Sequence, residues 1–341
     1  MHYSQELEEI ARNLTQGGRG ILAADESTGT IGKRLNAVGV ENSEENRRAF
    51  RELLFTAKDV SQFVSGVILY DETIRQSTAD GVAFPEYMRK NNMYPGIKVD
   101  TGAKPLAGAD DETVTEGLDG LRERLKEYHE IGARFAKWRA VIKIAATRPS
   151  RYALQTTAHA LARYAALCQE NGLVPIVEPE VLMDGDHTIQ RCYEVTELTL
   201  NTVFAALYEQ QVVFENMVLK PNMVISGMKC AEQAGVQEVA RQTVLCLKRT
   251  VPAAVPGIAF LSGGQSDEKA SAHLNAMQNY DSPWALSFSY GRALVASALK
   301  TWSGQSGQVE AAQSVLLHRA RLNSEASKGS YSEAMEKQAV A

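Results

Sequence analysis

The sequence predicts a single-domain α/β protein built as a closed (β/α)8 barrel, and three observations support this fold class. Short apolar runs alternate with longer segments of helical periodicity from one end of the chain to the other, as repeated βα units around a parallel sheet require. Eight such runs are present, the number of strands in this barrel. The 341 residues, 44% of them hydrophobic, fit one barrel with a large buried core.

The expected strands are five to ten residues long and carry few polar residues before their last positions. They are Ile21–Asp25, Gly66–Glu72, Gly96–Asp100, Phe135–Ile144, Val174–Glu180, Asn216–Pro221, Gly257–Gly264 and Trp284–Gly291.

Helical periodicity fills the intervals between these strands, and Gly172 and Pro252 stand where two of the helices would stop. The expected helices include Thr115–Ile131, Arg151–Asn171, His187–Tyr208, Gln237–Thr250 and Asp267–Gln278.

An open doubly wound sheet is the competing architecture. Its usual nucleotide-binding signal is a glycine-rich turn directly after the first strand. Here that strand is followed by Ala24-Asp25-Glu26-Ser27-Thr28-Gly29, which matches neither GxGxxG nor a P-loop. The closed barrel is therefore favoured.

The domain organisation expected from composition is one catalytic barrel, residues 1–323, and a mobile C-terminal tail, residues 324–341. The tail is rich in small and polar residues, which bury too little apolar surface to be held firmly.

Bulk properties narrow the class of protein. A net charge of −5 argues against a nucleic-acid binder, which needs many Lys and Arg contacts to phosphates. No apolar run approaches the roughly 20 residues that span a bilayer, and the start of the chain has no secretory pattern. The four scattered cysteines indicate reduced thiols. We expect a cytoplasmic protein without membrane or nucleic-acid partners.

Ionisable and polar residues gather at the C-terminal ends of the expected strands, where barrel enzymes assemble their active sites. Residues two apart on a strand share a face, so Lys137 would join Arg139, and Glu178 would join Glu180, in the barrel mouth. Each charge alone could simply mark where a strand meets water. The full set is Asp25, Asp71, Glu72, Asp100, Lys137, Arg139, Glu178, Glu180, Lys220, Ser262 and Ser289.

Lys220 lies inside the apolar strand Met217-Val218-Leu219-Lys220-Pro221. Burial and nearby positive charge disfavour its protonated form, and a neutral lysine attacks a ketone to form an iminium. By itself the residue could equally extend its ammonium to solvent from a strand end. The carboxylates Asp25, Glu178 and Glu180 could shuttle the protons that an iminium cycle requires.

The loops after the seventh and eighth strands are the usual phosphate site of barrel enzymes. They read Leu261-Ser262-Gly263-Gly264 and Ser289-Tyr290-Gly291-Arg292. Glycines let backbone N–H groups approach an anion, and Arg292 opens a helix with a partially positive N-terminus. These loops predict an anion site.

Metal chemistry is not indicated, because the histidines show no HxH or HExxH spacing. They are His2, His129, His159, His187, His273 and His318. We expect no metal and no cofactor.

Nearly the whole chain resembles the class I fructose-1,6-bisphosphate aldolases, which form a Schiff base with their substrate. The motifs are Gly20–Thr28 (GILAADEST), Phe135–Arg139 (FAKWR), Val177–Glu180 (VEPE), Leu219–Met223 (LKPNM), Phe260–Ser266 (FLSGGQS) and Phe288–Leu294 (FSYGRAL).

The resemblance implies a lyase that reversibly cleaves fructose 1,6-bisphosphate, in glycolysis, gluconeogenesis or carbon fixation. It implies that Lys220 forms the Schiff base, that Glu178 is the main acid/base, and that Asp25 accepts the C4 hydroxyl proton. Lys137 would supply positive charge beside Lys220, while Glu180 would orient Lys137 and Arg139.

The resemblance also implies substrate-binding residues. Arg139 would bind the sugar. The C1 phosphate would be held by Leu261, Ser262, Gly263, Ser289, Gly291 and Arg292, and the C6 phosphate would lie near Ser27, Thr30, Lys33 and Arg34.

Two positions depart from the family pattern. Thr101 stands where animal members place a lysine near the C6 phosphate, so the preference for a bisphosphate over a monophosphate is open. The chain ends Gln338-Ala339-Val340-Ala341, without the terminal tyrosine of animal members, and Tyr331 lies too far upstream to match it.

Two alternatives stay open at this point. Another Schiff-base barrel, such as a transaldolase or a deoxy-sugar aldolase, is the second enzymatic possibility. A binding scaffold, for example on cytoskeletal filaments, is a possibility of a different class. The resemblance further implies a homotetramer acting on small sugar phosphates.

Overall fold

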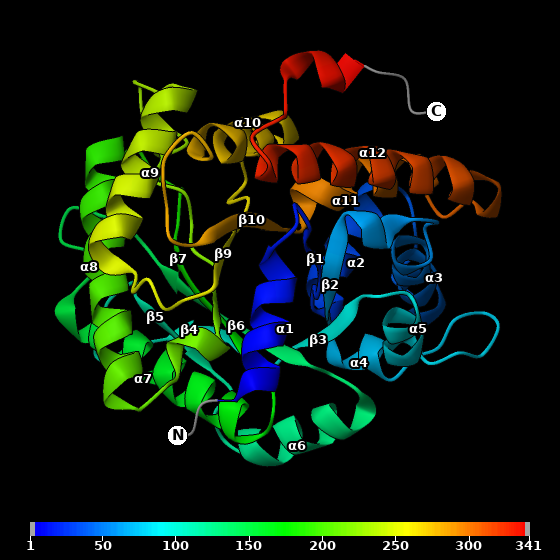
Figure 1. Ribbon diagram of the computed structural model, residues 1–341, viewed down its shortest axis with the longest axis horizontal. Coiled ribbons are helices and arrows are strands. Elements are labelled where there is room, and N and C mark those ends of the chain that lie inside the picture. The colour runs from blue at the N-terminus through cyan, green and yellow to red at the C-terminus, as the bar shows by residue number, and fades with distance from the viewer. Residues whose placement is uncertain (1–3, 338–341) are drawn as a thin grey trace.

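A computed structural model describes residues 4–337 of the chain. Within this range eight parallel strands close into a barrel in the order β1-β10-β9-β8-β7-β6-β3-β2. Each of the predicted strand segments overlaps one barrel strand, so the predicted (β/α)8 fold is confirmed. Figure 1 shows the helices arranged as an outer ring around the strands.

The barrel strands are short, and most of them end earlier than the sequence indicates. They are β1 Gly20–Ala24, β2 Val64–Leu69, β3 Tyr94–Lys98, β6 Phe135–Ile142, β7 Val174–Val181, β8 Val218–Leu219, β9 Gly257–Phe260 and β10 Ala285–Tyr290.

Helices connect the strands and follow them to the end of the described chain. They are α1 Gln5–Thr15, α2 Thr28–Ala37, α3 Glu44–Phe55, α4 Asp71–Ile74, α5 Phe84–Lys90, α6 Leu121–Ile131, α7 Arg151–Glu170, α8 Ile189–Glu209, α9 Val236–Thr250, α10 Asp267–Met277, α11 Arg292–Trp302 and α12 Val309–Ser327, with short 3-10 turns η1 Val60–Gln62, η2 Phe214–Asn216, η3 Ser306–Gln308 and η4 Glu333–Lys337.

The N-terminal helix α1 covers the floor of the barrel, and Figure 1 shows it crossing the strands. Its apolar face, Leu7, Ile10, Ala11 and Leu14, is buried in one cluster with inward-facing strand residues such as Ile176. The backbone of Ser4 exchanges two hydrogen bonds with the Asn216 side chain, at 3.0 and 2.7 Å. The first described residues therefore attach to the segment just before β8.

Two glycines let an aromatic ring fill the barrel interior above α1. Phe135 is fully buried, and a Cβ atom added to Gly96 would lie 2.2 Å from its ring. A Cβ atom on Gly66 would lie 2.9 Å from the same ring. Close packing of this kind leaves no room for a larger residue at either position.

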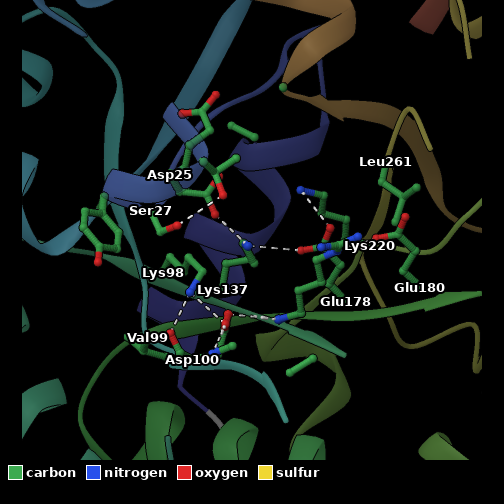
Figure 2. A pocket seen from close by; sticks show the side chains of 18 of the residues that line it. Asp25, Ser27, Lys98, Val99, Asp100, Lys137, Glu178, Glu180, Lys220 and Leu261 are labelled. Atoms are coloured by element: carbon green, nitrogen blue, oxygen red, sulfur yellow. Dashed lines mark hydrogen bonds and ion pairs between the residues drawn. The ribbon is translucent and has the colours of Figure 1, made fainter. Parts of the chain in front are cut away.

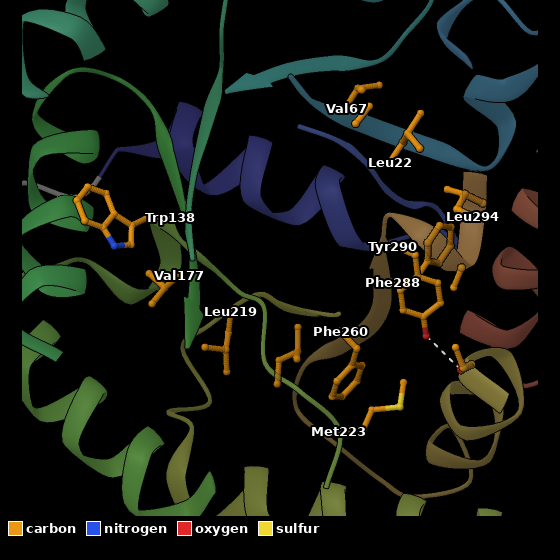
Figure 3. Close-up of a cluster of buried hydrophobic side chains, with 14 of the residues drawn as sticks. Leu22, Val67, Trp138, Val177, Leu219, Met223, Phe260, Phe288, Tyr290 and Leu294 are labelled. Carbon is orange, nitrogen blue, oxygen red and sulfur yellow. Dashed lines mark hydrogen bonds between the residues drawn. The ribbon is translucent and has the colours of Figure 1, made fainter. Parts of the chain in front are cut away.

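A second apolar layer separates the barrel from the surrounding helices. Strand residues that point outward, including Trp138, Val177 and Phe288, form one cluster with the inner faces of the helices (Figure 3). The Tyr290 hydroxyl in this layer donates to the carbonyl of Ala270 on α10, at 3.1 Å. Because outward positions are apolar, the polar residues on the same strands are directed into the barrel.

One sequence expectation about secondary structure is wrong. The predicted helix Thr115–Ile131 begins six residues later, at Leu121, and its first residues belong to a hairpin of β4 Gly102–Pro105 and β5 Thr113–Glu116. Thr115 and Val114 favour strands through their β-branched side chains. Gly117 at φ 127° and Gly120 at φ 64° then separate the strand from the helix.

The C-terminal segment is attached to α10 and α12. The expected tail boundary at Ser324 falls inside α12, which runs to Ser327. Tyr331 is buried, and its hydroxyl donates to Glu336 at 2.8 Å. Glu336 also pairs with Arg319 at 2.6 Å. Residues 338–341 lie outside the described residues, and mobility of the tail stays a prediction.

Within residues 4–337 no helix is both long enough and apolar enough to cross a membrane.

Candidate active site

A polar cavity of about 1040 Å³ opens at the C-terminal ends of the barrel strands. The wall is formed by the ends of the strands and by the loops that follow them, as in barrel enzymes generally. The strand-end residue Glu72 does not line this cavity and pairs with Arg47 at 2.6 Å. The other site residues named from the sequence do line it: Asp25, Ser27, Thr30, Lys33, Arg34, Asp71, Asp100, Lys137, Arg139, Glu178, Glu180, Lys220, Leu261, Ser262, Gly263, Ser289, Gly291 and Arg292.

Lys220 lies at the base of the cavity, and only 3% of it is exposed. Its backbone N–H donates to Val177 at 2.8 Å, which extends the pairing of β8 with β7 by one residue. Val218, two residues earlier, belongs to the barrel interior, so the alternation of the strand directs Lys220 inward above it. The buried amine thus faces the cavity, as the sequence predicts.

Glu178 lies between two lysines. Its Oε1 is 3.3 Å from Nζ of Lys220, and its Oε2 is 3.4 Å from Nζ of Lys137. Oε2 accepts no hydrogen bond from the described residues, although it is buried. A buried carboxylate oxygen without a donor is costly, so this atom is available to a proton or a hydroxyl group in the cavity.

Lys137 connects Glu178 to the opposite side of the barrel mouth (Figure 2). Its Nζ lies 2.6 Å from Oδ2 of Asp25. Burial alone would raise the pKa of Asp25, but the charges of Lys137 and Lys220 outweigh burial and lower it to about 2. Burial would also lower the pKa of Lys137, but Asp25, Glu178 and Asp100 hold it above its usual value. Both groups are therefore charged at neutral pH.

Glu180 and Arg139 form the next pair toward the opening. Arg139 Nε donates to Oε2 of Glu180. The side chain of Glu180 is 10% exposed and that of Arg139 is 44% exposed, so the guanidinium reaches the solvent-filled part of the cavity. Lys137 and Arg139 of β6, and Glu178 and Glu180 of β7, thus all line the cavity, as their spacing of two residues predicts.

Two glycine-containing loops face one another on the β9 and β10 side of the cavity. Gly263 and Gly264 have φ values of 56° and 77°, a region that side chains other than glycine's rarely adopt. A Cβ atom on Gly264 would lie 3.3 Å from the guanidinium of Arg292, the first residue of α11. The hydroxyl of Ser289 nearby is buried and has no partner among the described residues. These groups suit an anion.

The side chain of Gln265 holds the first of these loops. Its amide donates to the Ser262 carbonyl at 3.0 Å, and its oxygen lies 2.5 Å from Nδ1 of His273 on α10. Burial lowers the pKa of His273 to about 4, so the ring is neutral at neutral pH. A neutral ring with its proton on Nδ1 is the donor to Gln265.

A second group of hydroxyls and cations lies on the β1 side. The hydroxyls of Ser27 and Thr30 are 3.2 Å apart at the start of α2, and Lys33 follows on the same helix. The Arg34 guanidinium pairs with Glu26. The cavity therefore has two sets of cationic and hydroxyl-bearing groups, one at β1 and one at β9 and β10, and Lys220 lies directly after β8.

The sequence interpretation missed Lys98 as a site residue. Its Nζ lies 2.7 Å from Oδ1 of Asp100, and both residues line the cavity. Lys98 and Asp100 are two apart on the chain, so strand alternation could have identified the lysine. Glu26 was also missed, because β1 ends at Ala24 and alternation gives no guidance beyond that point.

Thr101, the first departure from the family pattern, is exposed and also lines the cavity, and its backbone N–H donates to Glu116 at 2.9 Å. Residues 338–341, which carry the second departure, lie outside the described residues, as does His2. In residues 4–337 no three or more His, Cys, Asp and Glu side chains are grouped to hold a metal ion.

Comparisons with known proteins agree with this geometry. Residues 6–341 match the family model described as glycolytic fructose-bisphosphate aldolase class I. A probable class 1 fructose-bisphosphate aldolase of Xanthomonas campestris is 60% identical over 96% of this chain and 98% of its own. The cytoplasmic isozyme 1 of the pea enzyme, Pisum sativum, is 54% identical over 96% of this chain and 92% of its own.

A solved structure has the same fold over almost the full length. The fructose-bisphosphate aldolase of Plasmodium falciparum, crystallised as a ternary complex with TRAP and a small molecule inhibitor, superposes with a TM-score of 0.95 and 50% sequence identity. The superposition covers 96% of this chain and 95% of the other.

Proposed function

The chain belongs to the class I fructose-bisphosphate aldolase family, and on that premise we propose that it cleaves fructose 1,6-bisphosphate through a Schiff base on Lys220. The observation that carries the proposal is the buried Lys220 amine, 3.3 Å from Glu178 at the base of a cavity with two sets of cationic groups. Fructose 1,6-bisphosphate has a ketone at C2 and a phosphate on each terminal carbon, so its two phosphates match these two sets in charge.

The first half of the proposed reaction forms the iminium. The unprotonated amine of Lys220 attacks C2 of the open-chain sugar, and the carbonyl oxygen takes up a proton to give a carbinolamine. Glu178 is close enough to receive the amine proton and to return a proton to the departing hydroxyl, which leaves as water. Its Oε1 lies 3.3 Å from the Lys220 amine, and its Oε2 accepts no hydrogen bond from the described residues.

The second half breaks the C3–C4 bond. Asp25 takes the proton of the C4 hydroxyl, glyceraldehyde 3-phosphate leaves, and the bonding electrons move to the iminium to give an enamine. Asp25 is held as a carboxylate by Lys137, which also lies 3.4 Å from Glu178. A small shift of Lys137 toward Glu178 would make Asp25 a stronger base when the C4 hydroxyl arrives.

The enamine is then protonated at C3 and hydrolysed, which releases dihydroxyacetone phosphate and restores the Lys220 amine. In the proposed pose the C1 phosphate lies against Ser262, Gly263 and Ser289, with Leu261, Gly291 and Arg292 completing that end. The C6 phosphate lies toward Ser27, Thr30, Lys33 and Arg34. Arg139, held by Glu180, binds the sugar hydroxyls.

Borohydride reduction tests the mechanism, because it converts an iminium into a stable secondary amine. Wild-type protein incubated with dihydroxyacetone phosphate and borohydride should gain the mass of one reduced adduct on Lys220. A Lys220→Ala variant should gain none, whereas a Lys143→Ala variant, which removes an exposed lysine elsewhere, should gain it as wild type does. Equal trapping of Lys220→Ala and wild type would reject the mechanism.

A transaldolase or deoxy-sugar aldolase activity is less well supported, because only a substrate with phosphates at both ends uses both cationic groups of the cavity. The ratio of kcat/KM for fructose 1,6-bisphosphate to that for fructose 1-phosphate measures how much the second phosphate contributes. It also tests whether the change at Thr101 weakens the C6 site.

We propose a cytoplasmic homotetramer that serves glycolysis, gluconeogenesis or carbon fixation. The cytoplasmic assignment rests on the pea relative. Large apolar side chains on the outer helices support association: Leu198 and Tyr208 on α8 are 52% and 76% exposed. Light scattering of the purified protein measures the number of subunits directly.

A further inference from the structure

A buried arginine lies just outside the candidate active site. Arg51 on α3 is 1% exposed, and its guanidinium is directed at the loop between β1 and α2. One terminal nitrogen donates to the Thr73 hydroxyl at 2.6 Å. The other donates to both the carbonyl and the carboxylate of Glu26, each at 3.1 Å. A buried cation is costly to desolvate, so its position calls for a compensating partner.

That partner is Glu26, whose carboxylate is shared. Oε2 of Glu26 pairs with Arg51, while Oε1 pairs with Arg34. The side chain of Glu26 is 7% exposed, that of Arg34 is 26% exposed, and both line the cavity. Arg34 is thus the solvent-accessible member of the group, and Arg51 is the buried one.

The charges of this group decide what an incoming phosphate meets. Glu26 alone with Arg34 would be a neutral pair, and an anion that drew Arg34 away would leave a buried carboxylate uncompensated. With Arg51 present the three side chains carry a net positive charge, because two guanidinium groups face one carboxylate. Arg34 can then turn to a phosphate while Glu26 remains paired.

We propose that Arg51 is a positioning residue that sets the preference for a substrate with a second phosphate. Arg51 stays paired with the Glu26 carboxylate and compensates its charge when the Arg34 guanidinium turns into the cavity. This inference rests on the proposed function, and in particular on the C6 phosphate lying near Arg34. Arg51 itself touches no substrate. It acts through Glu26.

The test compares steady-state kinetics on two substrates that differ only in the C6 phosphate. In Arg51→Met, Glu26 keeps Arg34, and KM for fructose 1,6-bisphosphate should rise about tenfold, the loss of one charge-assisted contact. KM and kcat for fructose 1-phosphate should stay close to wild type. Arg51→Lys keeps the charge and should recover most of the affinity for the bisphosphate.

The second variant removes the competing carboxylate. In Glu26→Gln, Arg34 is free of its partner, so KM for the bisphosphate should be equal to or below that of wild type. In the double variant Arg51→Met with Glu26→Gln, the defect of Arg51→Met should largely disappear. Arg48→Met is the matched control, because Arg48 lies on the same helix and pairs with Glu52 away from the cavity, at 2.5 Å.

Two results would overturn the inference. One is an equal change of both substrates in Arg51→Met, which would indicate a purely structural role. The other is a raised KM for the bisphosphate in Glu26→Gln, and this result decides the matter alone if Arg51→Met does not fold. Failure of the proposed function is distinct, because wild type itself would then neither cleave the bisphosphate nor be trapped by borohydride.

Discussion

The ammonium of Lys137 lies 2.6 Å from the carboxylate of Asp25, and both groups are buried beneath the mouth of the barrel. Removing either member would leave the other charge without its strongest partner in a region of low dielectric. The chemistry proposed for this site requires Asp25 to be ionised before the substrate arrives. Because Lys137 keeps Asp25 ionised, this pair affects the rate of turnover.

Lys137→Met should raise the pKa of Asp25, because burial then acts against the weaker influence of Lys220 and Lys98. The ionised form of Asp25 is the active one, so activity is lost as pH falls through this pKa. The acid limb of kcat/KM should therefore move to higher pH, with about a hundredfold loss at its optimum. Lys143→Met, at an exposed lysine near the end of the same strand, should leave the pH profile unchanged.

Asp25→Asn should separate bond cleavage from iminium formation. The amide cannot accept the C4 hydroxyl proton, so kcat for the bisphosphate should fall by a factor of about 10² to 10⁴. Borohydride trapping with dihydroxyacetone phosphate should persist, because that step uses Lys220 and Glu178. Complete loss of trapping would contradict the separate roles of the two carboxylates. Asp119→Asn, which changes an exposed carboxylate of the same cavity, is the control.

Gly264→Ala should weaken phosphate binding without unfolding the barrel. Alanine at φ 77° is strained by about 1 kcal/mol, and its Cβ atom would lie 3.3 Å from the Arg292 guanidinium. We expect KM for both sugar phosphates to rise, because the C1 phosphate is common to them. Gly29→Ala has open space around its Cβ atom and lies in α2, so its kinetics should match wild type.

Acid should destabilise the protein through His273. Its pKa in the folded protein is about 4, below the ordinary value of 6.5, because burial disfavours the charged ring. The neutral ring contributes stability that is present above pH 6.5 and is lost as pH falls toward 4, on the order of 3 kcal/mol in total. The free energy of unfolding, measured with urea at several pH values in this range, should depend less steeply on pH for His273→Asn than for wild type.

Gly96→Ala should destabilise the barrel by about 1–3 kcal/mol, because the new methyl group would overlap the Phe135 ring. Adding Phe135→Leu should recover part of the loss, since leucine leaves space for that methyl group. The free energies of unfolding of the two single variants and the double variant measure this coupling. If the effects of the two substitutions were additive, the close approach of Gly96 to Phe135 would contribute nothing to the free energy of unfolding.

The sequence predicted the barrel strands well because each is an apolar run with a polar end, a pattern that depends on local burial. Lys220, Glu178 and Lys137 were likewise recognised because strand alternation places them inside. Lys98 obeys the same rule and could have been included. The hairpin β4–β5 was missed because β5 lies just before the amphipathic helix α6 in the sequence, and both segments contain polar residues.

The group of Glu26, Arg34 and Arg51 could not be predicted in this way. Its members come from a loop and two helices, and their meeting depends on how α3 packs against the end of β1. A buried arginine on a helix gives no signal in a pattern that assigns charge to the solvent side. Only the three-dimensional arrangement reveals that Arg51 has no solvent to face.

The attachment of α1 beneath the barrel also bears on how the chain is made. This helix is made before the strands that it covers, yet it docks against β9 and β10 and pairs through Ser4 with Asn216, more than two hundred residues later. Contacts between such distant segments form slowly and only after the intervening chain exists. During translation the apolar face of α1 therefore stays uncovered until these strands exist, and the barrel around Lys220 closes only when β10 pairs with β1.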